Sequence, residues 1–353
     1  MSRILLVSAL LLWSSACAPA SDPVGDDHRA SRPDPPKVPP PKIHAPPEPL
    51  RTEVYGRALD APGDALDVSV DGGGGLWLTS TEGLFFRPAD ERFFLSLPGD
   101  HRTVGGLGAG LAAASGGEGA AVLIRHRSDQ RLTSSPFPAL DPQSLRIRSF
   151  EVGGSRRTFA ASGASVLSLD PQGRVEETGT LPVPVEASAL ALTQGTARAL
   201  WVGTRVGVFR LAIDEAGRFA SHFQEPLDLV ADRDDDVVDL DGCADGSVWI
   251  SALGHGVFHL RADGTLLEHL GREDVLPQDH ILSIACDLDG SVWMGTSWGG
   301  LVRRLPDGSF RYHNRTAGLP GDSIRRLVIQ EVPQGGRILW IATEAGLVSH
   351  SES

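Results

Sequence analysis

Apolar residues recur along this chain in short runs separated by turn residues, and the pattern is most regular between residues 281 and 314. Asp-Gly and Gly-Gly pairs flanked by apolar, β-branched or aromatic residues are strong signals for tight hairpins. The stretch therefore predicts a meander of four short strands. These strands are Ile281–Cys286, Ser291–Thr296, Leu301–Leu305 and Ser309–His313.

The same unit recurs before and after this stretch. Each copy has an apolar strand, a turn, and a second strand centred on a large apolar anchor that is followed by small residues and a glycine. The anchors are Trp77, Leu111, Phe159, Trp201, Trp249, Trp293 and Trp340, spaced 34 to 48 residues apart. This spacing is near the length of one four-stranded propeller blade. We predict an all-β, seven-bladed β-propeller with four-stranded antiparallel blades, although the weak second copy leaves six or eight blades as alternatives.

The two ends of the repeat region predict how the ring closes. The last unit ends after its third strand, at residues 348–350, and a strand-like segment at residues 52–59 precedes the first unit. If this N-terminal segment supplies the fourth strand of the last blade, two exposed sheet edges disappear. We therefore expect a closed ring that spans residues 51–351.

The amino-acid composition agrees with a turn-rich β protein and excludes one class of binding partner. The 353 residues include 41 Gly and 25 Pro, which favours many turns over long helices. The formal net charge of −13 argues against a nucleic-acid surface, which would need clustered Lys and Arg to neutralise phosphates.

The N-terminal residues are typical of an exported protein. Residues 1–17 have one basic residue, a short apolar run and then small residues before Cys17, as in a secretory signal. Cys17 follows Ser-Ser-Ala and is similar to the lipidated cysteine of bacterial lipoproteins, although ordinary cleavage to a soluble protein is the alternative. Residues 18–50 are rich in proline and predict an extended tether between this anchor and the ring.

The repeat also resembles a known family. Residues 284–305, with their Asp-Gly-Ser-Val-Trp-x-Gly-Thr core, and the linker at 318–324 resemble the two-component regulator propeller repeat, and the resemblance extends over about residues 65–350. It implies a seven-bladed periplasmic sensor ring. No kinase or DNA-binding segment follows residue 353 in this sequence, so we expect any signalling to need a second protein.

Candidate binding residues come from the turns and connections that should open on one face of such a ring. The turns between second and third strands contribute Glu82, Arg205, His255, Trp298 and Glu344, and the connections between blades contribute Asp235, Asp279, His280 and Asp322. The three aspartates recur two residues before an innermost strand. They could form a ring that binds a cation or a basic ligand, or each could cap its own turn.

Three further features suggest a binding site, a metal site or a covalent link, and each also has a simpler structural explanation. Trp298 lies in a turn beside two glycines, where it could stack on a ligand or pack on its neighbour. His255 and His259 share one strand face and could form a metal pair, but no third ligand is near in sequence. Cys243 and Cys286 end the innermost strands of adjacent blades and could form a disulfide in an oxidising compartment.

These observations favour an exported, membrane-tethered binding module without catalytic activity. Its partner would be a small molecule, a glycan or an envelope protein, with Cys17 holding it in the outer membrane or at the periplasmic side of a membrane. Two alternatives remain. One is a propeller lyase that uses His255 or His280 with a divalent cation, Ca²⁺ or Mg²⁺, and the other is an envelope scaffold. No other cofactor is expected, because no nucleophile elbow, phosphate-binding loop or metalloprotease motif is found in the sequence.

Overall fold

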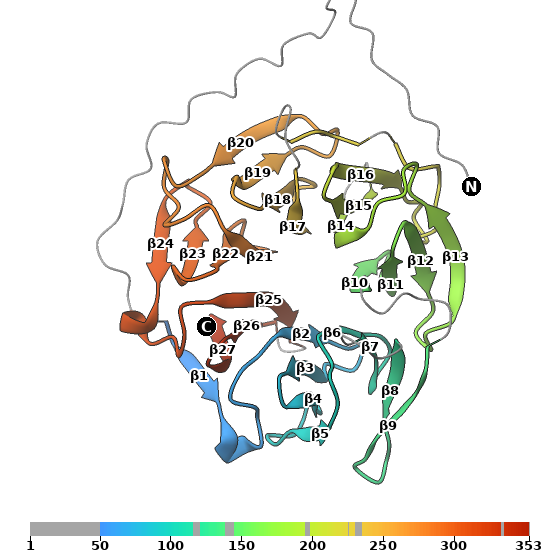
Figure 1. Cartoon of the computed structure of the whole chain (residues 1–353), viewed down its shortest axis with the longest axis vertical. Coiled ribbons are helices and arrows are strands. Elements are labelled where there is room, and N and C mark those ends of the chain that lie inside the picture. The colour runs from blue at the N-terminus through green and yellow to red at the C-terminus, as the bar shows by residue number, and fades with distance from the viewer. Residues whose placement is uncertain are drawn as a thin grey trace, which may run out of the picture. The chain divides into compact units, whose positions relative to one another are not determined.

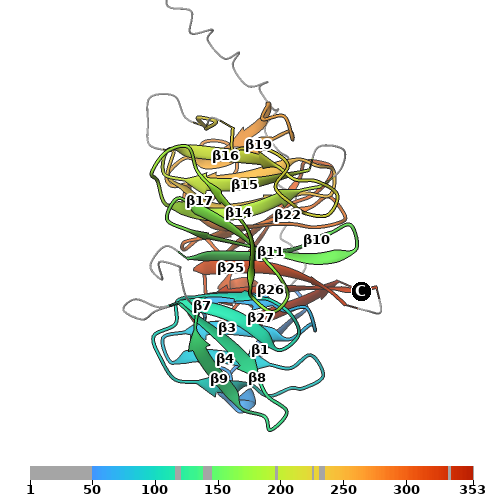
Figure 2. The same ribbon diagram turned by 90° about the vertical axis from the view of Figure 1, so that its right-hand side faces the viewer.

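A computed structural model describes residues 50–115, 121–137, 145–194, 198–224, 226–229, 235–332 and 335–352. Within these residues the chain forms seven antiparallel sheets arranged as a ring (Figure 1). Figure 2 shows the ring from its edge, with strands such as β14 and β25 running across its thickness. The predicted all-β, seven-bladed propeller is therefore confirmed.

The blades follow one another along the chain, and the first strand of each blade is the innermost. Blade 1 contains β2 (Asp67–Val70), β3 (Leu76–Ser80), β4 (Gly83–Arg87) and β5 (Leu95–Leu97), and blade 2 contains β6 (Thr103–Gly106), β7 (Leu111–Ser115), β8 (Val122–His126) and β9 (Leu132–Pro136). Blade 3 contains β10 (Arg146–Val152), β11 (Ser155–Ser162), β12 (Ser165–Leu169) and β13 (Val175–Thr180), and blade 4 contains β14 (Ala187–Thr193), β15 (Ala199–Thr204) and β16 (Gly207–Ala212). Blade 5 contains β17 (Val237–Gly242), β18 (Val248–Ala252), β19 (Gly256–Leu260) and β20 (Leu266–Leu270), and blade 6 contains β21 (Ile281–Cys286), β22 (Val292–Thr296), β23 (Leu301–Arg304) and β24 (Phe310–His313). Blade 7 contains β25 (Ile324–Glu331), β26 (Arg337–Thr343), β27 (Gly346–Glu352) and the N-terminal strand β1 (Thr52–Tyr55).

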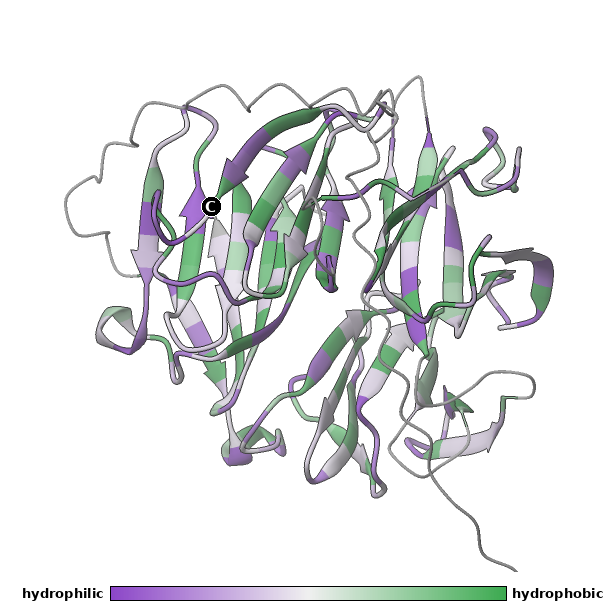
Figure 3. Ribbon diagram, turned by 45° about the horizontal axis from the view of Figure 1, so that its top comes forward, coloured by the Kyte–Doolittle hydropathy of each residue, from purple (hydrophilic) through white to green (hydrophobic). Residues whose placement is uncertain are grey.

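The hydrophobic core lies between the blades. Each of the seven apolar clusters found among the described residues joins two neighbouring blades, because both faces of every inner strand meet another sheet. Hydrophobic residues accordingly run along the strands, whereas turns carry many hydrophilic ones (Figure 3). The five anchor tryptophans are at most 1% exposed. As predicted, they are core residues that fill the gaps between blades.

The anchor of blade 2 differs from the predicted one by two residues. The backbone N–H of Leu107 donates to the carbonyl of Leu111, just as that of Asp287 donates to Ser291 in blade 6. Leu111 is therefore equivalent to Ser291, and Ala113 occupies the place of the Trp293 anchor. Because Ala113 is small, it does not mark the anchor position in the sequence, and the sequence pattern predicts Leu111 in its place.

The small residue two positions after the anchor has a packing role. A Cβ built on Gly295 would lie 2.6 Å from Cγ2 of Ile324, and one built on Gly203 would lie 2.4 Å from Cγ1 of Val237. Ile324 and Val237 begin the innermost strands of the following blades. The Trp-x-Gly-Thr motif therefore records how closely each blade approaches the next.

The ring closes as the sequence predicted. Strand β1 pairs antiparallel with β27, from Thr52 opposite His350 to Tyr55 opposite Leu347 (Figure 1). The predicted strand at residues 52–59 is shorter in the structure, because residues 57–59 form a 3₁₀ helix, η1 (Arg57–Leu59). A second 3₁₀ helix, η2 (Arg315–Ala317), lies between blades 6 and 7.

Blade 4 departs from the four-stranded prediction. It has three regular strands, and the described residues 219–224, 226 and 227 lie along the edge of β16 without forming a fourth. Val208 and Leu227 form an isolated antiparallel bridge there, and Gln224 N–H donates to the carbonyl of Arg210. Pro226 has no N–H to donate, so a continuous fourth strand cannot form along this edge.

Candidate functional site

A cavity of about 330 Å³ lies at one mouth of the central channel. It is lined by residues at or next to the first positions of the innermost strands of six blades, where the connections between blades enter these strands. Val104, Ile147, Val237 and Val238 supply apolar wall. The charged lining consists of Arg102, Arg146, Arg148, Arg325, Arg326, Asp67, Asp236 and Asp239.

Several of these charges occupy one equivalent position in the ring. In each innermost strand, one residue pairs with the position two residues after the blade's anchor. Strand pairing identifies these residues as Asp67, Thr103, Arg146, Ala189, Asp239, Ser283 and Arg326. Four blades therefore place a charged side chain at a level where the other three place a small or polar one. The small residues leave space for the cavity, and the charged residues supply the hydrogen-bond donors and acceptors at this level.

Asp239 is the buried hub of this charged ring. Its Oδ1 accepts hydrogen bonds from Nη2 of Arg148 (3.0 Å) and Nη1 of Arg326 (3.1 Å). Its Oδ2 accepts from Oγ of Ser283 (2.8 Å) and from the backbone N–H of Ile284 (3.0 Å). Burial opposes ionisation of Asp239, but the two guanidinium groups and these hydrogen bonds outweigh it and lower the pKa. One carboxylate thus ties together blades 3, 5, 6 and 7.

Arg146 has a different environment. Its Nε donates to the carbonyl of Ser188 (2.8 Å) and its Nη1 to the carbonyl of Leu145 (3.0 Å). Among the residues that the structure describes, no carboxylate lies within ion-pair distance of it. Burial lowers the pKa of Arg146, although the nearby charges of Asp67 and Asp239 act in the opposite direction. Its positive charge is therefore the least compensated in the cavity.

A second buried carboxyl lies deeper in the channel, at the level of the anchors. Asp241 accepts a hydrogen bond from the backbone N–H of Cys286 (2.9 Å). Burial raises the pKa of Asp241 to about 6, despite the opposing charge of Arg148. Near pH 6 this group therefore compensates the arginines only in part.

The rim of the cavity is solvated and largely ion-paired. Nε of Arg102 lies 3.4 Å from Oδ1 of Asp100, and Nη1 of Arg325 lies 3.3 Å from Oδ2 of Asp64. Asp236 is exposed. The Arg102–Asp100 pair is exposed and therefore contributes little to stability, whereas the Arg325–Asp64 pair is half-buried.

The three predicted connection aspartates do not line the cavity. The side chains of Asp235, Asp279 and Asp322 each accept a hydrogen bond from a backbone N–H six or seven residues earlier, within their own connection. A carboxylate ring that binds a cation or a basic ligand stays a prediction. The hydrogen bonds fit the turn-capping alternative, in which Asp recurs because every connection needs the same acceptor.

The two predicted turn glutamates also stabilise connections. Glu82 Oε1 accepts from the backbone N–H of Gly63 (3.1 Å). Glu344 accepts from the backbone N–H groups of Asp322 (3.0 Å) and Ser323 (2.9 Å). Each carboxylate therefore fastens the connection that enters its own blade, and neither reaches the cavity.

The remaining candidates lie in loops and outside the cavity lining. Trp298 is 72% exposed, and its ring centroid lies 6.0 Å from that of His280. Arg205 is exposed in the turn between β15 and β16, and His255 lies in the turn before β19. The roles predicted for these residues remain predictions.

The suggested metal pair is not supported by the local geometry. The imidazole of His259 stacks on Trp249, with ring centroids 4.3 Å apart. His255 lies in the turn before β19, and its backbone carbonyl accepts from Nε2 of His269 if that nitrogen carries the proton. In the described part of the chain, no group of three or more His, Cys, Asp or Glu side chains could hold a metal ion.

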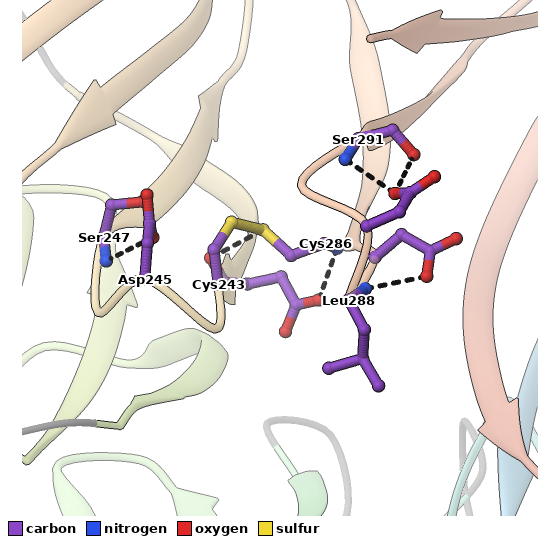
Figure 4. Close-up of a disulfide and its surroundings, with 9 residues drawn as sticks. Cys243, Asp245, Ser247, Cys286, Leu288 and Ser291 are labelled. Carbon is purple, nitrogen blue, oxygen red and sulfur yellow. Dashed lines mark hydrogen bonds between the residues drawn. A yellow bond between two sulfur atoms is a disulfide. The ribbon is translucent and has the colours of Figure 1, made fainter. Parts of the chain in front are cut away.

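Cys243 and Cys286 form a disulfide, with Cα atoms 5.1 Å apart (Figure 4). It joins blades 5 and 6 at the ends of their innermost strands, opposite the ends that line the cavity. In the neighbouring turns Asp245 accepts hydrogen bonds from Ser247, and Asp289 from Ser291 (Figure 4). The Asp-Gly-Ser motif of the repeat therefore serves turn geometry.

The leader, residues 1–17 with Cys17, lies outside the described residues, as does the predicted tether up to residue 49. No helix in the described portion is long and apolar enough to cross a membrane.

Sequence reasoning missed the cavity arginines because it searched turns and connections. A usable signal was present. Arg146 and Arg148 interrupt an apolar strand in SLRIRSF, as Asp239 does in VVDLDG and Arg326 does in SIRRLV. Charged residues in strands with two covered faces need partners, and alignment on the anchors would have placed them at matching levels.

No family model and no curated protein matches this chain. Virginiamycin B lyase from Staphylococcus aureus is similar in structure, with a TM-score of 0.62 and 13% identity over 86% of this chain and 99% of the lyase. The extracellular domain of BT3049, described as a hybrid two-component system of Bacteroides thetaiotaomicron, has a TM-score of 0.60 and 15% identity over 86% of this chain and 41% of that one. YCF48 bound to a D1 peptide has a TM-score of 0.59 and 14% identity over 88% and 97%. Proteins with different roles share this ring, and at these identities the likeness is one of fold alone.

Proposed function

We propose that this protein is an exported ligand-binding module of the sensor type, and that the central cavity is its binding site. The observation that carries the proposal is the convergence of six blades on one cavity with both apolar and charged walls. Ligand sites in proteins are typically concave, mostly preformed, and lined by apolar groups with a few placed polar ones. Its volume of about 330 Å³ suits a small molecule.

Export is supported by three independent features. The N-terminus has the pattern of a secretory signal. The disulfide between Cys243 and Cys286 suits an oxidising compartment. The fold is also found in extracellular domains described as parts of two-component and one-component systems. A separate kinase or envelope protein would read the bound state.

Ligand binding can be tested by thermal shift of the full-length protein against amino acids, sugars, nucleosides, short peptides and carboxylic acids. A ligand at 100 times its Kd should stabilise the ring by about 2.7 kcal/mol. Val238→Trp, which fills the cavity, should abolish the shift. Val175→Trp, which makes the same substitution at an exposed position of β13, should preserve it. A shift that survives Val238→Trp would place the site elsewhere, with the loop around Trp298 as the next candidate.

The same screen separates binding from catalysis. Because lyases share the fold, each stabilising compound should be incubated with the protein and Mg²⁺ and followed by mass spectrometry. An unchanged compound supports a binding module. Consumption that is lost in His255→Ala or His280→Ala would favour the lyase alternative instead, and the absence of any ligand would favour the scaffold.

We propose Cys17 as the lipid anchor of the exported protein. Cys17→Ser should move the protein from the membrane to the soluble fraction, because a thioether-linked lipid needs the thiol. Cys243→Ser is a control that removes a cysteine of the disulfide and leaves Cys17 in place. If Cys17→Ser fractionates with membranes like the unaltered protein, the anchor is wrong and cleavage near Cys17 to a soluble protein becomes the better explanation.

A further inference from the structure

We infer that the cavity recognises the carboxylate of a small organic acid, and that Arg146 is the residue that binds it. This inference rests on the proposed function, because it assigns a ligand class and a recognition group to the same site. It follows from three observations: the charge balance inside the cavity, the unused donor of Arg146, and the apolar wall beside it.

The pairing of charges in the cavity leaves one arginine without a carboxylate partner. The inner wall carries the three guanidinium groups of Arg146, Arg148 and Arg326 and the carboxylates of Asp67 and Asp239, and Asp241 lies deeper, near Arg148. Asp239 bonds both Arg148 and Arg326, and Oδ1 of Asp67 lies 3.4 Å from Nε of Arg326. Both carboxylates are thereby engaged with arginines other than Arg146. The carboxylate of a ligand would give Arg146 the partner that it lacks.

The geometry of Arg146 is suited to this role. Its Nε and Nη1 donate to backbone carbonyls, which hold the guanidinium plane in place. Within the described residues its Nη2 donates no hydrogen bond. This atom is not fully buried, so a ligand can reach it. A fixed, accessible N–H donor with a full positive charge is a strong partner for a carboxylate oxygen.

The rest of the cavity wall suggests the body of the ligand. Val104, Ile147 and Val237 line the cavity beside the arginines. A short aliphatic or aromatic chain attached to the carboxylate would cover this surface and exclude water from the ion pair, which strengthens it.

The first experiment uses the unaltered full-length protein and matched probes. Acetate, butanoate, hexanoate and benzoate should be compared with acetamide, butanamide, hexanamide and benzamide by thermal shift and calorimetry. We expect at least one acid to bind and its amide to bind at least tenfold more weakly. If amides or sugars bind in the cavity and no acid does, the ligand class is wrong although the cavity is still a binding site.

The second experiment tests Arg146 itself with the acid that binds best. Arg146→Gln should weaken its binding about tenfold or more, the loss that accompanies a charge-assisted hydrogen bond. Arg146→Lys should retain part of the affinity because it keeps the charge without the planar donor. Arg311→Gln, an exposed arginine on β24 and outside the cavity lining, should change affinity less than twofold. Circular dichroism and the unliganded Tm establish that each variant is folded.

Two results would overturn the assignment to Arg146. One is unchanged acid binding in a folded Arg146→Gln protein. The other is a larger loss in Arg205→Gln than in Arg146→Gln, which would move recognition to the turns of the same face. An acid that binds equally well to the Val238→Trp protein would likewise show that carboxylates bind outside the cavity.

Discussion

Asp239→Asn is expected to lower the free energy of unfolding by about 3–5 kcal/mol, the range found when one partner of a buried ion pair is removed. The substitution keeps the shape of the side chain and removes its charge. It leaves Arg148 and Arg326 buried without their shared carboxylate, and they belong to blades 3 and 7. Urea unfolding of the full-length variant at pH 7 measures the loss directly.

The effect should depend on pH in a defined direction. The pKa of Asp239 is lower in the folded protein than its usual value of 3.8. A carboxyl with a depressed pKa stabilises the fold at pH values above its unfolded pKa and loses this contribution as the pH falls below it. The unfolding free energies of Asp239→Asn and the unaltered protein should therefore differ fully at pH 5–7 and converge below about pH 4.

Two comparisons separate the hub from a general charge effect. Asp236→Asn makes the same charge change at an exposed position of the same cavity and should alter stability by less than about 0.5 kcal/mol. Arg148→Met, added to Asp239→Asn, should restore part of the lost stability, because Asp239 is the one carboxylate that pairs with Arg148 among the described residues. If Asp236→Asn destabilises as much as Asp239→Asn, the hub has no special role.

Deleting strand β1 should open the ring and cause a comparable or larger loss. A protein that begins at residue 57 lacks four paired residues and the side chain of Tyr55, which is 7% exposed and lies 5.4 Å from Trp340 and 6.2 Å from Phe94 between ring centroids. Removing a large buried aromatic side chain alone is worth about 3–5 kcal/mol. The edge of β27 would also be left unpaired, which promotes association.

A protein that begins at residue 50 is the matched control, because it lacks the N-terminal residues but retains β1. Its Tm should equal that of the full chain, whereas the protein beginning at residue 57 should melt at least 10 °C lower or associate in sedimentation. A synthetic peptide of residues 50–56 should restore part of the loss by adding the strand in trans. Equal Tm values for the two shortened proteins would mean that β1 does not hold the ring closed.

The fold could be predicted from the sequence to a large extent because its units are local. An Asp-Gly turn between apolar runs specifies a hairpin through nearby residues alone, and Trp293 and its equivalents mark where each blade must be filled. Prediction failed where the local signal was weak. Ala113 occupies an anchor position but is not a large apolar residue. Pro226 interrupts the segment where the repeat predicts the fourth strand of blade 4.

The site could not be predicted in the same way. Its residues are far apart in the sequence and come together only because the blades close into a ring. Residues that recur at regular spacing, such as Asp279 and Asp322, were conspicuous in the sequence and proved to cap connections. Arg146 and Asp239 are 93 positions apart and lie in different blades, yet they line the same cavity. The sequence by itself determined the repeat and the strand that closes the ring, and it favoured seven blades over six or eight, because those depend on short-range pattern. Only the tertiary structure decided which charges meet at the channel mouth, because that depends on the closure of seven sheets around one axis.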